Sequence, residues 1–238
     1  MKPLLIPSLC LLLLGIKTAC AAEPLPAQSE NHFEARITVT AKTDYLLFLP
    51  RDYAKSKHRW PLMLFLHGSG ESGSDLAKVK THGPAKLVED RPDFPFIVVS
   101  PQNSGRGWNP DTLNALLDRI VSKYRVDKHR IYLTGLSMGG YGTWTLAAEH
   151  PERFAAAAPI CGGGNPKDAA LLAGLPIWAF HGALDTKVPV ARTRDMVAAV
   201  KAAGGNIRYT EYPQAGHDCW TETYANPELY TWLLEHHR

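Results

Sequence analysis

The sequence predicts one α/β domain with a mostly parallel sheet, an antiparallel edge at its N-terminal side, helices on both faces and no substantial lid. From residue 61 to the C-terminus, apolar runs of strand length alternate with helical patterns, at the spacing of right-handed crossovers. The chain has 238 residues and 45% hydrophobic content, enough to bury one full core. No repeat or linker divides it, so we assign residues 32–238 to a single domain.

The first 22 residues have the pattern of a secretory signal peptide. Lys2 precedes an apolar run over residues 4–16 that is too short to cross a bilayer comfortably, and small residues follow, with a cut expected after Ala21 or Ala22. A lipoprotein signal acylated at Cys20 is the alternative, although Lys17 stands where such a signal has an aliphatic residue. We expect a secreted or periplasmic protein, with residues 23–31 as a loose tether.

The net charge and the motifs of the sequence limit which nucleic-acid, membrane and cofactor partners we expect. The formal net charge of +3 gives no sign of a nucleic-acid partner, nor of a membrane partner beyond that lipid anchor. No motif for a metal, nucleotide or flavin is present, so we expect no cofactor. The oligomeric state stays open.

The elements follow from local patterns taken along the chain. Alternating residues over 33–41 and the run 44–50 predict two antiparallel strands, and the continuous apolar run 61–66 predicts a strand covered on both faces. Residues 78–90 hold a broken helical segment, and Asp111 is a candidate cap for a helix over 112–124. The remaining expected strands are 96–100, 131–134, 154–160, 176–180 and 207–212, and the remaining helices follow residue 137 and span 190–203 and 227–236.

Ser137 lies at a sharp turn between the strand 131–134 and a small-residue helix. Gly135 and Gly139 flank it in the pattern Gly-x-Ser-x-Gly, which holds a serine hydroxyl clear of the strand because a Cβ at either flanking position would collide. The Met138 amide opens the helix and would face a developing oxyanion. A glycine-rich turn with an incidental serine is the alternative.

A second glycine-rich turn, residues 67–73, follows the strand 61–66. Such a turn presents backbone N–H groups, and we assign the second oxyanion donor to Ser69, with Gly70 next in line. A flexible loop is the alternative interpretation. We expect His67 to anchor this loop through its ring nitrogens.

Asp185 and His217 each follow a later strand of the predicted sheet. A serine needs a base to take its proton, and the base needs an acceptor on its other nitrogen. His217 is the histidine in a loop after the last strand, whereas His181 begins its loop too early to reach Ser137. Asp185 is preferred to Asp218, which adjoins His217 and faces its ring poorly.

Aromatic and cysteine residues gather at the same predicted edge of the sheet. Candidate substrate contacts are Trp108, Asn103, Tyr141 and Trp220, although Trp108 can equally serve as a packing plug. Cys161 and Cys219 fall at this edge too, as one disulfide or as two free thiols.

Together these segments resemble the secreted bacterial α/β-hydrolases known as predicted peptidases, dienelactone-hydrolase-like and esterase/depolymerase-like proteins. The resemblance covers residues 45–238 and rests on the stretches 67–71, 135–144, 159–164, 181–185 and 215–218. It implies a serine hydrolase in which Ser137, Asp185 and His217 form the triad, in the chain order of that architecture. Dienelactone hydrolases proper use a cysteine nucleophile, and here the elbow holds serine.

We therefore expect a serine carboxylesterase acting on short-acyl, aryl or polysaccharide-linked esters of acetyl or feruloyl type. The alternative within the same chemistry is a peptidase of prolyl-oligopeptidase-like type, which usually depends on an extra domain to select peptides. A non-catalytic binding module with the same fold is a third interpretation, and the intact trio of Ser137, Asp185 and His217 argues against it.

Overall fold

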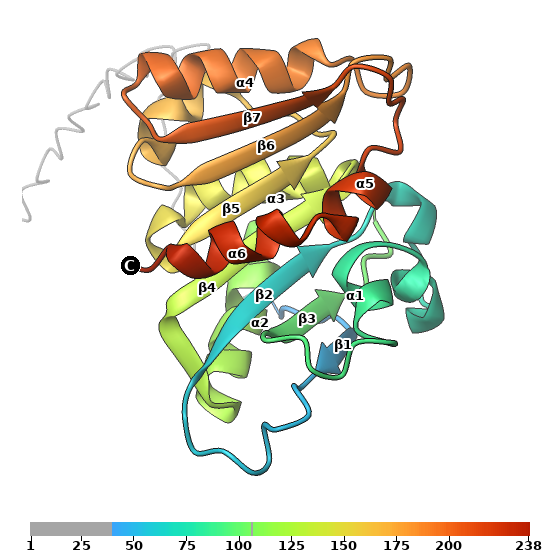
Figure 1. Ribbon diagram of the computed structural model, residues 1–238, viewed down its shortest axis with the longest axis vertical. Helices are drawn as coiled ribbons and strands as arrows, with labels where there is room; N and C mark the ends of the chain where they lie inside the picture. Colours follow the sequence, from blue (N-terminus) through green and yellow to red (C-terminus); the bar gives the residue numbers. More distant parts are fainter. Residues whose placement is uncertain (1–39, 106) are drawn as a thin grey trace, which may run out of the picture. The chain divides into compact units, whose positions relative to one another are not determined.

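The computed structural model describes residues 40–105 and 107–238. These residues form a domain built on one seven-stranded sheet (Figure 1). The strand order is β1-β3-β2-β4-β5-β6-β7. The strands are β1 (Tyr45–Phe48), β2 (Trp60–Leu66), β3 (Ile97–Pro101), β4 (Val126–Leu136), β5 (Ala156–Ile160), β6 (Ile177–Gly182) and β7 (Ile207–Tyr212). β1 runs antiparallel to β3 and the other pairs are parallel, which confirms the predicted sheet with its antiparallel N-terminal edge.

Helices cover both faces of this sheet, and the central strands are therefore buried on both sides. Along β2, Leu62, Leu64 and Leu66 enter one core, and Met63 and Phe65 enter the other, as the two-residue period of a strand requires. The first core is closed by α2 (Pro110–Lys123), α3 (Met138–Glu149) and α4 (Ala191–Ala202). The second is closed by α1 (Gly83–Leu87), α5 (Trp220–Ala225) and α6 (Pro227–Glu235), with α6 in front of the sheet in Figure 1.

Several element boundaries differ from the predictions for local reasons. The helix expected at 112–124 begins at Pro110, because Asn109 accepts the Thr112 N–H and proline suits the first helical position, so Asp111 lies in the first turn instead of capping it. The segment 78–90 divides into the 3₁₀ turn η2 (Leu76–Thr81) and the short helix α1. The other 3₁₀ turns are η1 (Ser69–Glu71), η3 (Pro151–Arg153) and η4 (Pro166–Leu172).

Part of the N-terminal prediction lies outside the described residues. This holds for the signal peptide over 1–22, its Cys20 alternative, the tether over 23–31 and residues 33–39 of the first expected strand. Residues 40–44, which are described, form no strand. No helix in the described part of the chain is long and apolar enough to span a membrane.

Candidate active site

Ser137 occupies a strained turn between β4 and α3, where the tight packing explains both flanking glycines. Its φ of 53° and ψ of −116° lie in a region that side chains rarely adopt. A Cβ on Gly135 would lie 2.4 Å from the Gly139 carbonyl oxygen, and a Cβ on Gly139 would lie 1.9 Å from the Leu66 carbonyl oxygen. Strand, turn and helix therefore pack too closely for any other residue at either position.

Three side chains from separate loops form one hydrogen-bonded chain at the carboxyl ends of the strands. His217 Nε2 lies 3.0 Å from Ser137 Oγ, and His217 Nδ1 lies 2.7 Å from Asp185 Oδ2. Because the carboxylate accepts, Nδ1 carries the ring proton and Nε2 is left to accept from the serine hydroxyl. The structure thus brings together the three residues that the sequence selected for this chemistry.

Asp185 is buried and held by hydrogen-bond donors on both oxygens. Its Oδ1 accepts the amides of Lys187 at 2.8 Å and Val188 at 2.9 Å. Burial alone would raise the pKa of Asp185, but the hydrogen bonds from His217, Val188 and Lys187 outweigh it and lower that pKa. The carboxylate therefore stays ionised, as the orienting partner of an imidazole must.

His181, which the sequence analysis excluded as the base, contacts Asp185, a contact that the sequence did not indicate. It is fully buried, and its Nε2 lies 3.1 Å from Asp185 Oδ2 and 3.0 Å from the Val188 carbonyl oxygen. Both neighbours accept hydrogen bonds, so Nε2 carries a proton and donates to the carboxylate. As predicted, His181 makes no hydrogen bond to Ser137 among the described residues, but it fixes the residue that orients His217.

The loop that carries Ser69 lies directly beside the serine. A Cβ on Gly68 would lie 3.5 Å from Ser137 Cβ, so the next residue of the loop is close to Ser137. Ser69 opens η1 and Met138 opens α3, where backbone N–H groups lack intrahelical acceptors. Within residues 40–105 and 107–238, the turn and cap hydrogen bonds use neither of these two amides.

His67 and Glu71 hold this loop in place. Asn103 N–H donates to His67 Nε2 at 3.1 Å, so Nδ1 carries the proton and donates to the Gly68 carbonyl at 2.6 Å. This agrees with the anchoring predicted for His67. The buried carboxylate of Glu71, which the sequence analysis did not select, accepts the Gly68 N–H at 2.9 Å and thereby orients the residue before Ser69.

On the ester hydrolysis that the sequence leads us to expect, Glu71→Ala should lower kcat about tenfold with a smaller change in KM. The Gly68 amide would lose its acceptor, and the loop would hold the Ser69 N–H less firmly where the oxyanion forms; losing such a donor outright costs about 10²–10³-fold in kcat. Stopped-flow hydrolysis of p-nitrophenyl acetate measures this. Glu71→Gln keeps an acceptor at the same length and should recover most of kcat.

The exposed carboxylate of Glu89, paired with Lys80, supplies the control for this substitution. Glu89→Ala should leave kcat unchanged. Equal losses of kcat in Glu71→Ala and Glu71→Gln would mean that the charge of Glu71, and not its hydrogen bond to Gly68, is what matters.

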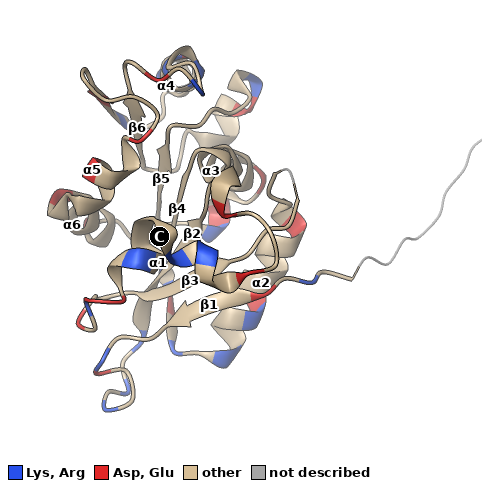
Figure 2. Cartoon of the chain, turned by 90° about the vertical axis from the view of Figure 1, so that its right-hand side faces the viewer, with Lys and Arg blue, Asp and Glu red and all other residues tan. Residues whose placement is uncertain are grey.

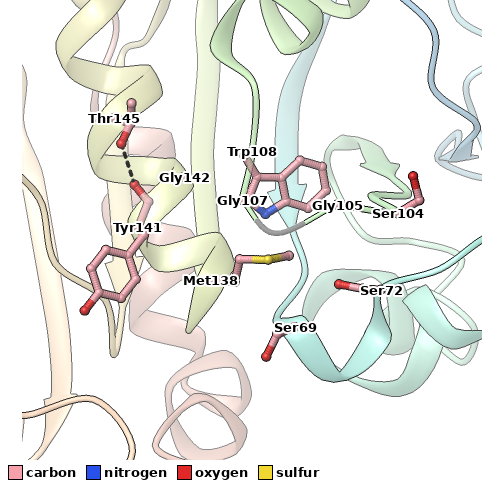
Figure 3. A pocket seen from close by; sticks show the side chains of 10 residues that line it. All are labelled: Ser69, Ser72, Ser104, Gly105, Gly107, Trp108, Met138, Tyr141, Gly142 and Thr145. Carbon is pink, nitrogen blue, oxygen red and sulfur yellow. Dashed lines mark hydrogen bonds between the residues drawn. The ribbon is translucent and has the colours of Figure 1, made fainter.

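A hollow of about 660 Å³ opens beside Ser69 and Met138 on the α3 side of the sheet (Figure 3). Its lining residues are Ser69, Ser72, Ser104, Gly105, Gly107, Trp108, Met138, Tyr141, Gly142 and Thr145. Figure 3 shows the Met138 thioether between the Trp108 ring and Ser69. The hollow is large enough for an aromatic group and has hydroxyls around an aromatic and thioether floor.

The four predicted substrate contacts divide between this hollow and other roles. Trp108 lines the hollow, as a substrate contact would, and also packs edge-on against His67 with ring centroids 4.9 Å apart, as a packing residue would. Tyr141 lines the hollow and is partly exposed, whereas Trp220 packs edge-on against His217 with ring centroids 5.1 Å apart, outside it.

Asn103, which the sequence made a candidate for the rim of a substrate cleft, does not line this hollow. Its amide nitrogen donates to the Gly107 carbonyl, and its amide oxygen accepts the Gly105 N–H. The loop itself therefore uses both ends of the side chain, and Asn103 shapes the rim instead of facing a ligand.

Cys161 and Cys219 are fully buried and stand as two free thiols, which corrects the disulfide interpretation. Burial raises the pKa of Cys161 well above its ordinary value, and a hydrogen bond with the Cys219 thiol raises it further. A disulfide forms through a thiolate, so enclosure of the pair opposes its oxidation. In the described part of the chain, no cluster of three or more His, Cys, Asp or Glu side chains is arranged to hold a metal ion.

Comparison with known proteins places these features in a family. The model of the Dienelactone hydrolase family matches residues 98–227, more than half of the chain. The chain is 25% identical over 186 residues to the "Probable feruloyl esterase C" of Aspergillus terreus, covering 73% of this chain and 63% of that protein. It is 40% identical over 121 residues to the poly(3-hydroxyalkanoate) depolymerase C of Paucimonas lemoignei, covering 43% of this chain and 28% of that protein.

A solved structure agrees with these sequence comparisons. The crystal structure of a thermostable esterase superposes with a TM-score of 0.70 at 36% identity, covering 82% of this chain and 59% of that one. This chain thus spans less than two thirds of the length of each of these three proteins.

Proposed function

Because this chain belongs to the dienelactone hydrolase family, we propose that it hydrolyses carboxylic esters with Ser137 as the nucleophile. The observation that carries the proposal is the hydrogen-bonded chain from Ser137 Oγ through His217 to Asp185. A serine hydroxyl is a weak nucleophile until a base removes its proton, and His217 Nε2 lies where that base must be.

The reaction proceeds through an acyl-enzyme. Ser137 Oγ attacks the ester carbonyl carbon as its proton passes to His217 Nε2, and Asp185 stabilises the imidazolium that forms. The amides of Ser69 and Met138 stabilise the oxyanion. His217 then gives its proton to the departing alcohol oxygen, and a water molecule, deprotonated by the same imidazole, releases the acid.

The acyl group enters the hollow beside Ser69 and Met138. Its ring and hydroxyl lining suits acetyl or aryl acyl groups of feruloyl type, on small or polymer-linked esters. Two of the similar proteins are named "Probable feruloyl esterase C" and "Poly(3-hydroxyalkanoate) depolymerase C", which supports an ester as the substrate class.

An acyl-group panel tests this choice of substrate. Among p-nitrophenyl esters, we expect kcat/KM for the ferulate and the acetate to exceed that for the palmitate at least tenfold, since an open hollow lined by hydroxyl and aromatic groups would leave much of a C16 chain in contact with water. Aminoacyl-naphthylamides should be cleaved far more slowly than the aryl esters. A preference for palmitate would contradict the assigned acyl site, and faster amide cleavage would indicate a peptidase.

A further inference from the structure

A second hollow, of about 310 Å³, lies between α1 and α5 on the other face of the sheet. Its walls are formed by His82, Gly83, Lys86, Leu87, Asp90, Arg91, Trp220, Thr221, Tyr224 and Ala225. Ser69 and Met138 line the hollow beside α3, whereas His217 does not line this second hollow but contacts its wall residue Trp220. The reaction proposed above assigns no role to this second hollow.

Two aromatic contacts join this second hollow to the reacting groups. The Trp220 ring, which forms part of its wall, lies edge-on to His217 at 5.1 Å between centroids. His82, also in the wall, packs against Trp220 at 5.5 Å and places its Nε2 3.8 Å from Glu71 Oε1. The hollow is therefore linked to the imidazole through the Trp220 ring, and to Glu71, which supports the oxyanion loop, through His82.

The proton transfers decide which part of an ester this hollow can receive. His217 takes the proton of Ser137 and returns it to the alcohol oxygen, so the alcohol must leave on the imidazole side. The acyl carbon is bonded to Ser137 and its oxygen points to the Ser69 and Met138 amides, which places the acyl group in the hollow beside them. The α1–α5 hollow is thus on the alcohol side.

The chemistry of its walls indicates what that alcohol carries. The rings of His82 and Trp220 offer faces and edges of the kind that pack against sugar rings, whereas Tyr224 is almost fully buried. Lys86 and Arg91 add two cations against the single carboxylate of Asp90, and Figure 2 shows basic residues on the ribbon at α1.

These two cations are available to a ligand. In the part of the chain that the structure describes, the ion pairs around α1 are Lys80–Glu89 and His82–Glu71, and neither Lys86 nor Arg91 belongs to one. The Arg91 guanidinium instead lies 5.9 Å from the centre of the Phe94 ring. An anionic group entering the hollow would therefore meet two uncommitted cations.

We propose that the α1–α5 hollow binds the alcohol-side sugar of a polymer-linked ester, and that this sugar is a uronic acid. Its volume of about 310 Å³ suits one sugar ring. The aromatic walls contact the ring, and Lys86 and Arg91 bind its carboxylate. The inference rests on the proposed ester hydrolysis and specifies the substrate class of that site.

A matched pair of substrates tests the proposal by kinetics. The 3-O-acetyl esters of methyl β-D-glucopyranosiduronate and methyl β-D-glucopyranoside differ at the C6 carboxylate. At low ionic strength we expect kcat/KM to be about tenfold higher for the uronate, mainly through KM, and the difference to shrink in 0.5 M salt because salt screens exposed charges. Equal values for the two esters in the wild-type protein would overturn the proposal.

Substitutions assign the preference to the two cations. In the double variant Lys86→Gln, Arg91→Gln, the ratio of kcat/KM for uronate over glucoside should fall to about one. Lys80→Gln removes a neighbouring lysine that is paired with Glu89 outside the hollow, and it should keep the wild-type ratio. If the Lys80 variant loses the ratio as fully as the double variant, general surface charge and not the hollow is responsible.

Binding without turnover separates this inference from the proposed function. Methyl β-D-glucuronide titrated into the Ser137→Ala protein should quench tryptophan fluorescence saturably, through Trp220, and methyl β-D-glucoside should bind about tenfold more weakly. A wild-type protein that hydrolyses esters while its Ser137→Ala variant binds neither sugar would defeat the inference alone. Saturable glucuronide binding to a protein that hydrolyses no ester would defeat the proposed reaction and keep the hollow as an acidic-sugar site.

Discussion

Ser137→Ala is expected to lower kcat for p-nitrophenyl acetate hydrolysis by about 10⁴-fold or more, to the residual level that binding and oxyanion stabilisation alone provide. The hydroxyl that His217 Nε2 faces at 3.0 Å is the group that would form the proposed acyl-enzyme. A fluorophosphonate probe should label the wild-type protein at Ser137 and leave the variant unlabelled.

The same variant should remain folded. Alanine keeps the Cβ that the turn already accommodates, so the midpoint of thermal unfolding should change by only a few degrees. The matched control is Ser122→Ala, which removes an exposed hydroxyl on α2 that donates to the Arg119 carbonyl, and it should keep full activity. Wild-type turnover in folded Ser137→Ala protein would exclude the acyl-enzyme mechanism.

Gly139→Ala is expected to destabilise the fold by about 3 kcal/mol or more, or to prevent its accumulation. Alanine would gain about 1 kcal/mol of helix propensity over glycine within α3. Its Cβ, however, would lie 1.9 Å from the Leu66 carbonyl oxygen, a backbone atom of the central strand β2 that cannot rotate away. The steric cost of the Cβ therefore outweighs the gain in helix propensity. Urea unfolding monitored by circular dichroism measures the resulting change in the free energy of unfolding.

Gly174→Ala is the control for this substitution. Gly174 is exposed, a Cβ there would meet nothing within 4 Å, and its backbone conformation is open to other residues. We expect its unfolding free energy to stay the same or to rise by up to about 1 kcal/mol, through the lower entropy of the unfolded chain. Equal stability of the two variants would mean that α3 can move away from β2.

Local sequence patterns were enough to predict the sheet of this molecule and the helices that connect its strands. Apolar runs such as residues 61–66 must be strands covered on both faces, and their alternation with helical periods implies parallel crossovers. Because the carboxyl ends of parallel strands meet at one edge, the residues after separate strands could be expected to converge. Ser137, Asp185 and His217 do converge there.

Contacts between distant segments could not be predicted from local sequence patterns. His181 was set aside because it could not reach Ser137, and its bond to Asp185 depends on the turn between them. Glu71 reads as an ordinary polar loop residue until its carboxylate is seen on the Gly68 amide. Asn103 was assigned to substrate because its use by its own loop depends on backbone directions that a sequence pattern does not encode.

The sequence by itself determined the sheet, its edge strand and the choice of Ser137, Asp185 and His217, because strand and turn periodicities are local properties. Only the tertiary structure decided that Trp220 faces away from the hollow beside Met138, that the two cysteines meet as free thiols, and that α1 and α5 enclose a second hollow. The physical reason is that a cavity is defined by the packing of segments far apart in the chain, here residues 82–91 and 220–225.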